Sequence, residues 1–202
     1  MWRLNPVPEE QFVRELRGIA SRLHPAGNVE PHFLRLLAQS PASLTAYLRA
    51  EEALGTGRLT PHQREEISLA VAEINGSHYC VATHELAGKH VGLSDEDVSF
   101  ARKAWSKDSK TQAMLHFVQA IVLQRGEISD DDFSAMRSAG FAGPEIIEIL
   151  ANVGLNIFTN YFNLLAQTDL DHPSTQTGPP GRAPNQPSEK DRGPLHRRAQ
   201  SQ

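Results

Sequence analysis

A cysteine and the histidine four residues after it are the two residues of this chain with the clearest potential for chemistry. Cys80 is the only cysteine in the sequence, so neither an intramolecular disulfide nor a cysteine-only metal site is possible. His84 follows at a spacing that places both side chains on one face of a helix. An imidazole next to a thiol in the first turn of a helix favours the thiolate. The pair therefore predicts a nucleophilic or redox-active cysteine.

Two more side chains could complete a proton relay with this pair. Ser77 lies three residues before Cys80, close to the same helix face, where its hydroxyl could hydrogen-bond the sulfur. Glu65 lies on the preceding helix, just before residues 67–74, which are apolar almost all round and are expected to be buried. A carboxylate next to a buried segment needs a partner, and His84 is a natural one. The four residues follow the pattern Glu-x11-Ser-x2-Cys-x3-His.

Other interpretations of these residues stay open at this stage. A lone cysteine in a helix is often a small buried apolar residue. A cysteine and a histidine four residues apart are also half of a metal site, but His78 and His90 lie on other faces of the same helix. We therefore expect no metal and no cofactor.

Four asparagines on the last predicted helix form a second polar feature. They recur at spacings of four, four and three residues, which places them on one stripe of an otherwise apolar helix: Asn152, Asn156, Asn160 and Asn163. Asparagine is a poor helix former, so this stripe needs a reason. It predicts either a buried hydrogen-bond network or amides that line the site near Cys80. In the second case, Asn160 is an auxiliary site residue.

The elements that must position these residues are all predicted to be helices. No run alternates as a strand would, so the fold class is all-α with about eight helices and no sheet. Thr60 begins a capping box with proline at the first helical position, and Ser94 and Ser129 are N-caps followed by acidic residues. Helical segments are expected at about 8–24, 31–39, 41–54, 60–75, 77–91, 94 onward, 109–125, 129 onward and 143–167.

The amino-acid composition divides the chain into a body and a C-terminal tail. Residues 1–172 are predicted to form a single helical domain, whereas residues 173–202 are rich in proline and glycine and poor in large apolar side chains, which is typical of disorder. The tail is basic, but its charges are interspersed and lack aromatic neighbours, so nucleic-acid binding is not expected. No run approaches the roughly 18 apolar residues of a membrane span, and no export signal is evident. We therefore expect a cytoplasmic protein.

The motif resembles a known family. Residues 65–84 resemble the alkylhydroperoxidase D-like branch of the carboxymuconolactone decarboxylase family, which has a glutamate, a Cys-x-x-Cys motif and a histidine in this register. Glu65, Cys80 and His84 match the glutamate, the second cysteine and the histidine. Ser77 stands where the first cysteine is expected, and Tyr79 inside the motif is also similar to the family. Residues 158–163 and 168–173 resemble the C-terminal helix region of many members, so the resemblance covers roughly residues 30–173.

This resemblance implies an all-helical protein that assembles into a trimer, hexamer or other homo-oligomer such as a dimer. It also implies a cofactor-free thiol peroxidase, an antioxidant oxidoreductase of peroxiredoxin type, with Cys80 as the catalytic thiol and His84 and Glu65 as its base and relay. A serine at 77 cannot form a disulfide, so an external thiol reductant would have to restore Cys80. The alternatives are a non-catalytic oligomeric binding or regulatory member and a cofactor-free lyase or isomerase of a small carboxylated lactone, with His84 as base.

Overall fold

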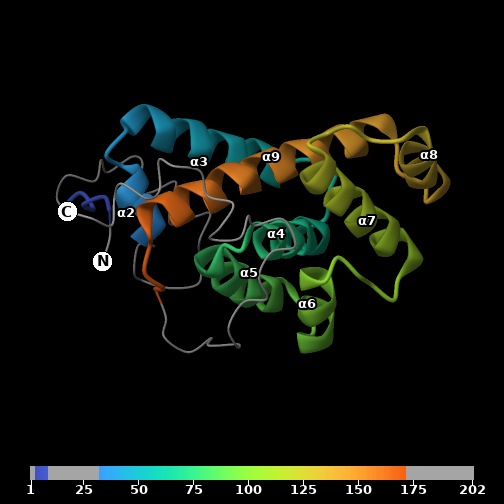
Figure 1. The fold of residues 1–202 in the computed structure, drawn as a ribbon, viewed down its shortest axis with the longest axis horizontal. Helices are drawn as coiled ribbons and strands as arrows, with labels where there is room; N and C mark the ends of the chain where they lie inside the picture. The colour runs from blue at the N-terminus through green and yellow to red at the C-terminus, as the bar shows by residue number, and fades with distance from the viewer. Residues whose placement is uncertain (1–2, 9–31, 172–202) are drawn as a thin grey trace, which may run out of the picture.

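The described part of the chain is entirely helical. The computed structural model describes residues 3–8 and 32–171, and within these residues there are eight helices and no strand (Figure 1). This confirms the predicted fold class. The helix predicted at 8–24 and the tail at 173–202 fall almost entirely outside the described residues. The helices are α2 (His32–Leu37), α3 (Pro41–Gly55), α4 (Pro61–Asn75), α5 (His78–Val91), α6 (Asp95–Arg102), α7 (Ser109–Gln124), α8 (Asp130–Ser138) and α9 (Gly143–Ala166).

The helix ends follow the capping residues of the sequence. Thr60 accepts a hydrogen bond from the Gln63 N–H, and the Gln63 side chain accepts from the Thr60 N–H, which confirms the predicted capping box. Ser94 caps α6 and Ser129 caps α8, each by accepting from the backbone N–H three residues later. Gly76 ends α4 in the left-handed region at φ +68°, which glycine adopts at low cost. These local signals explain why most boundaries agree with the sequence pattern.

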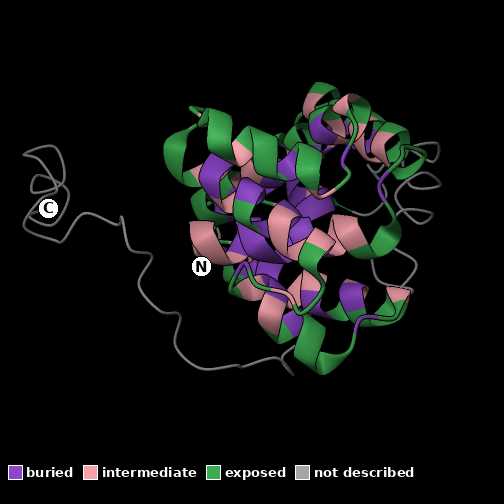
Figure 2. Cartoon of the chain, turned by 90° about the vertical axis from the view of Figure 1, so that its right-hand side faces the viewer, coloured by how far each residue is buried: buried purple, intermediate pink, exposed green. Residues whose placement is uncertain are grey.

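Helix α4 occupies the centre of the fold. It packs against α5, α6, α7 and α9, which surround it in Figure 1. Its residues from Glu66 to Ala72 are all buried, so the apolar segment predicted at 67–74 is buried over most of its length. The buried residues gather in the middle of the molecule and the exposed ones lie outside (Figure 2). Because α4 carries Glu65 one residue before this segment, the core fixes the place of that carboxylate.

A second apolar cluster surrounds the start of α5. Cys80 belongs to it, together with buried residues of α2 and α3. Phe33 and Tyr47 pack edge to face there, with their ring centroids 5.0 Å apart. The N-terminal segment lies against the same end of the fold, since Arg3 N–H donates to the Ala166 carbonyl and Val7 N–H donates to the Arg35 carbonyl. Cys80 is therefore enclosed by α2, α3, α5 and α9.

Within residues 3–8 and 32–171, no single helix is long and apolar enough to cross a membrane. Helices α8 and α9 reach the required length and hydropathy only as a pair bent by 118°.

Candidate functional site

The turn between α4 and α5 places the cysteine. Ser77 is the N-cap residue of α5, and Cys80 lies in the first turn of that helix. Unlike Thr60, Ser94 and Ser129, Ser77 makes no hydrogen bond from its side chain to its own helix. Ser77 is 1% exposed, and its hydroxyl makes no well-formed hydrogen bond, although it lies close enough to Cys80 to favour the thiolate. The local sequence therefore gives α5 a serine cap whose hydroxyl is not used for capping.

Polar side chains from α9 surround the sulfur of Cys80. The Asn163 side chain donates a hydrogen bond to Cys80 Sγ at 3.4 Å and another to the Thr159 carbonyl at 3.0 Å. Asn160 is fully buried, and its side-chain oxygen accepts from Asn75 at 3.0 Å. The predicted asparagine stripe thus serves both roles, because Asn152 and Asn156 bond the backbone of α9 whereas the two later asparagines face Cys80.

Burial and hydrogen bonding act in opposite directions on the cysteine. Burial raises the pKa of the Cys80 thiol, while the polar side chains of Ser77, Asn163 and Asn160 oppose the rise by favouring the thiolate. The net direction is upward, whereas the sequence predicted a thiolate near neutral pH. The difference arises because Cys80 is only 3% exposed, and the helix N-terminus and its donors do not compensate for that loss of water.

The histidine and glutamate of the motif meet as predicted. His84 Nδ1 lies 2.8 Å from Glu65 Oε2, and each side chain is about one-fifth exposed. Burial favours the neutral ring, but the charge and hydrogen bond of Glu65, together with the charge of Glu51, raise the pKa of His84 above its ordinary value. The protonated imidazolium is therefore favoured. The role of His84 as a base stays a prediction.

A tyrosine and a glutamate on α3 join the site without having been predicted. Tyr47 and Glu51 lie four residues apart and share a side-chain hydrogen bond. Burial raises the pKa of Glu51, and the charges of His84 and Glu65 also act on it. Burial likewise raises the pKa of Tyr47, with contributions from Glu51 and Cys80. The spacing Tyr47-x3-Glu51 repeats that of Cys80-x3-His84, which is the one signal in the sequence that could have indicated this second pair.

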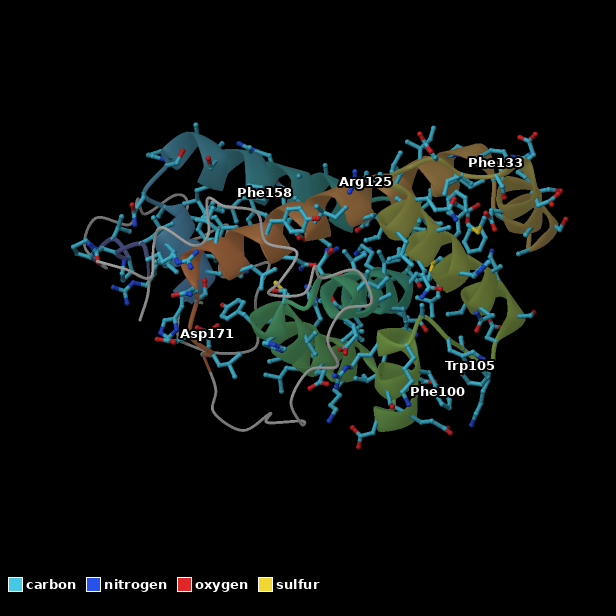
Figure 3. The ribbon with its side chains drawn as sticks, in the orientation of Figure 1. Phe100, Trp105, Arg125, Phe133, Phe158 and Asp171 are labelled. Atoms are coloured by element: carbon cyan, nitrogen blue, oxygen red, sulfur yellow. The ribbon has the colours of Figure 1, made fainter. Side chains whose placement is uncertain are left out.

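Tyr79 has a different environment from the other predicted residues. The Tyr79 hydroxyl donates a hydrogen bond to Asp171. It accepts another from the Phe33 N–H at 3.4 Å. Asp171, labelled in Figure 3 near the start of α5, also accepts from the His32 N–H at 2.8 Å. Burial raises the pKa of Tyr79, and the charge and hydrogen bond of Asp171 raise it further. The hydroxyl of Tyr79 thus ties α5 to α2 and to the segment after α9, and it is not directed to the sulfur.

The described residues contain no group of three or more His, Cys, Asp or Glu side chains arranged to hold a metal ion. The side chains that the structure does bring together are a thiol, two amides, a serine, a tyrosine–carboxylate pair and a carboxylate–imidazole pair. Such a set can move protons and stabilise a reactive sulfur.

Part of the chain matches a known family. Residues 41–122, which include α3, α4 and α5 with Glu65, Cys80 and His84, match the carboxymuconolactone decarboxylase family. This match confirms the resemblance that the sequence motif indicated. Among curated proteins, no sequence matches this chain.

Solved structures of similar fold include peroxidase-related proteins and a debrominase. An alkylhydroperoxidase AhpD core protein from Ralstonia eutropha JMP134, described as peroxidase-related, has a TM-score of 0.74 and 22% identity, over 83% of this chain and 91% of that chain. A peroxidase-related protein from Silicibacter sp. TM1040 has a TM-score of 0.73 and 21% identity, over 83% and 91%. The debrominase Bmp8 has a TM-score of 0.74 and 14% identity, over 84% and 92%. At these identities the likeness shows the fold alone.

Replacing Glu65 by glutamine should lower the pKa of His84. Because its pKa is raised in the folded protein, the protonated ring stabilises the fold below the ordinary histidine value of about 6.5, and this contribution is lost as pH rises through the higher folded value. Without the Glu65 charge, the effect of burial should dominate and bring the pKa of His84 below that ordinary value. NMR titration of the imidazole measures this directly.

The matched control for this experiment is Glu52→Gln, which removes an exposed carboxylate of α3 that pairs with Arg49. It should leave the titration of His84 unchanged. An unchanged pKa of His84 in Glu65→Gln would show that the carboxylate does not control the ring.

Proposed function

We propose that the protein is a thiol-dependent hydroperoxide reductase, an antioxidant oxidoreductase in which Cys80 is the single redox-active residue. The observation that carries the proposal is the Glu65–His84 hydrogen bond of 2.8 Å one helical turn from a buried cysteine whose sulfur accepts from Asn163. The match of residues 41–122 to the carboxymuconolactone decarboxylase family supports it. The peroxidase-related descriptions of similar folds agree with it.

The reaction begins at the sulfur. The Cys80 thiolate attacks the terminal oxygen of R–O–O–H, the O–O bond breaks, and an S–O bond forms. The sulfur is oxidised to a sulfenic acid, Cys80–S–OH, and the peroxide is reduced to the alkoxide R–O⁻. Protonation of this alkoxide gives the alcohol R–OH. The peroxide hydrogen stays on the transferred oxygen, so the step needs one proton from the protein for the leaving group.

His84 is suited to supply that proton. Its raised pKa favours the protonated ring, and Glu65 holds the ring one turn from Cys80. The proton of the resting thiol must leave first, and Glu51 is suited to accept it because burial raises the pKa of this carboxyl group above that of an ordinary glutamate. Tyr47, which shares a hydrogen bond with Glu51 and is influenced by the charge of Cys80, would pass the proton between them in this proposal.

An external thiol completes the cycle. Because Ser77 offers no second sulfur, a thiol R′–SH attacks the sulfenic acid, releases water and leaves a mixed disulfide on Cys80. A second R′–SH then releases R′–S–S–R′ and restores the Cys80 thiol. We expect this chemistry in the cytoplasm, where such thiols are abundant.

One observation favours a second candidate, a non-catalytic binding or regulatory member of the family. The net effect of burial on Cys80 is to raise its pKa, which is the behaviour of a packing residue. The lactone lyase or isomerase considered from the sequence is a third class. It would use His84 alone, so its activity would survive Cys80→Ala.

Hydroperoxide consumption by the full-length protein, with dithiothreitol as reductant, tests the proposal. Cys80→Ala should abolish turnover, and His84→Gln should lower kcat/KM by about a hundredfold, the usual effect of losing a general acid. His116→Gln is the matched control, because His116 is an exposed histidine of α7 outside the site. Turnover that persists in Cys80→Ala, or a wild-type protein that consumes no hydroperoxide, would refute the proposal.

A further inference from the structure

Three buried polar atoms without a well-formed hydrogen bond belong to side chains around the sulfur of Cys80. Among the described residues, the buried side-chain atoms that lack a hydrogen-bonding partner are Ser77 Oγ, Asn160 Nδ2, Asn163 Oδ1 and Thr168 Oγ1. The residues of the first three all lie next to Cys80 and are at most 4% exposed. Leaving a buried polar atom unpaired is costly, so three together indicate a group that they bind.

The hydrogen-bonding character of these atoms limits the kind of group that they can bind. Asn160 Nδ2 can only donate, Asn163 Oδ1 can only accept, and the Ser77 hydroxyl can donate. The complement is an oxygen that accepts two hydrogen bonds and donates one. An S–O–H group on Cys80 has this complement, because its oxygen carries two lone pairs and one hydrogen.

We propose that Ser77, Asn160 and Asn163 form a binding site for the oxygen atom that a hydroperoxide leaves on Cys80. This rests on the proposed function, since it is the product of that reaction which the site holds. Ser77 and Asn160 donate to the sulfenic oxygen, and its hydrogen is donated to Asn163. The serine at the position of a first cysteine thus has a role of its own, which is to stabilise the oxidised sulfur.

The consequence is a long-lived sulfenic acid. Further oxidation to the sulfinic acid needs the S–O–H proton to be removed and a second peroxide to be attacked, and both are disfavoured while the group is bonded on three sides. The oxidised form should therefore persist until an external thiol reaches it.

The lifetime of the sulfenic acid tests this site. The full-length protein is treated with stoichiometric hydrogen peroxide, and Cys80 is trapped with dimedone at increasing times and quantified by mass spectrometry. The wild type should hold the sulfenic acid, whereas Ser77→Ala and Asn160→Ala should each shorten its lifetime by about tenfold, the effect of one lost hydrogen bond. Asn152→Ala is the control, because Asn152 is buried on the same helix but bonds the Glu148 carbonyl.

The outcomes separate this site from the proposed function. Equal lifetimes in wild type and variants, or direct appearance of the sulfinic acid, would overturn the oxygen site and leave the peroxidase reaction standing. A persistent sulfenic acid without thiol-driven turnover would support the site and refute the function. An unmodified thiol would overturn both. Ser77→Ala removes one oxygen atom only, and its thermal unfolding shows whether the fold is kept.

Discussion

Four asparagine side chains lie buried along one side of α9, and each must find hydrogen-bonding partners inside the protein to replace those it had in water. Asn152 and Asn156 meet this constraint with carbonyls of their own helix, and Asn160 and Asn163 meet it only in part, facing Cys80. The polar side of α9 faces inward, and its apolar side is consequently exposed. The surroundings of the sulfur follow from this orientation.

The thiol is held between two opposing effects. Burial in the cluster formed with α2 and α3 raises the pKa of Cys80 and keeps it protonated at rest, while the donors of Ser77 and α9 favour the anion once it forms. Two acid–base pairs lie around it: Glu65 with His84, and Glu51 with Tyr47. In the proposed reaction, the proton leaves through one pair and is supplied by the other. A thiol that is buried and protonated in this way would react when a peroxide and a proton acceptor are both bound next to it.

Much of this arrangement follows from the sequence. The capping box at Thr60 and the serine caps at Ser94 and Ser129 fixed helix ends within a residue or two, because capping is a local interaction. The contact between Glu65 and His84 was predicted because a carboxylate next to a buried segment needs a partner. The contributions of Tyr47 and Glu51 could not be predicted, because they depend on how α3 packs against α5. The raised pKa of Cys80 was also missed, since burial is set by the tertiary fold and outweighs the local effect of the helix N-terminus.

The central claim is that Cys80, Ser77, Asn160 and Asn163 form one site that accepts an oxygen atom from a hydroperoxide. A crystal structure of the full-length protein after treatment with one equivalent of hydroperoxide tests it most directly. The account predicts one additional oxygen bonded to Cys80 Sγ, within hydrogen-bonding distance of Ser77 Oγ, Asn160 Nδ2 and Asn163 Oδ1. An unoxidised sulfur in crystals of the treated protein, or an oxygen directed away from these three atoms, would contradict it.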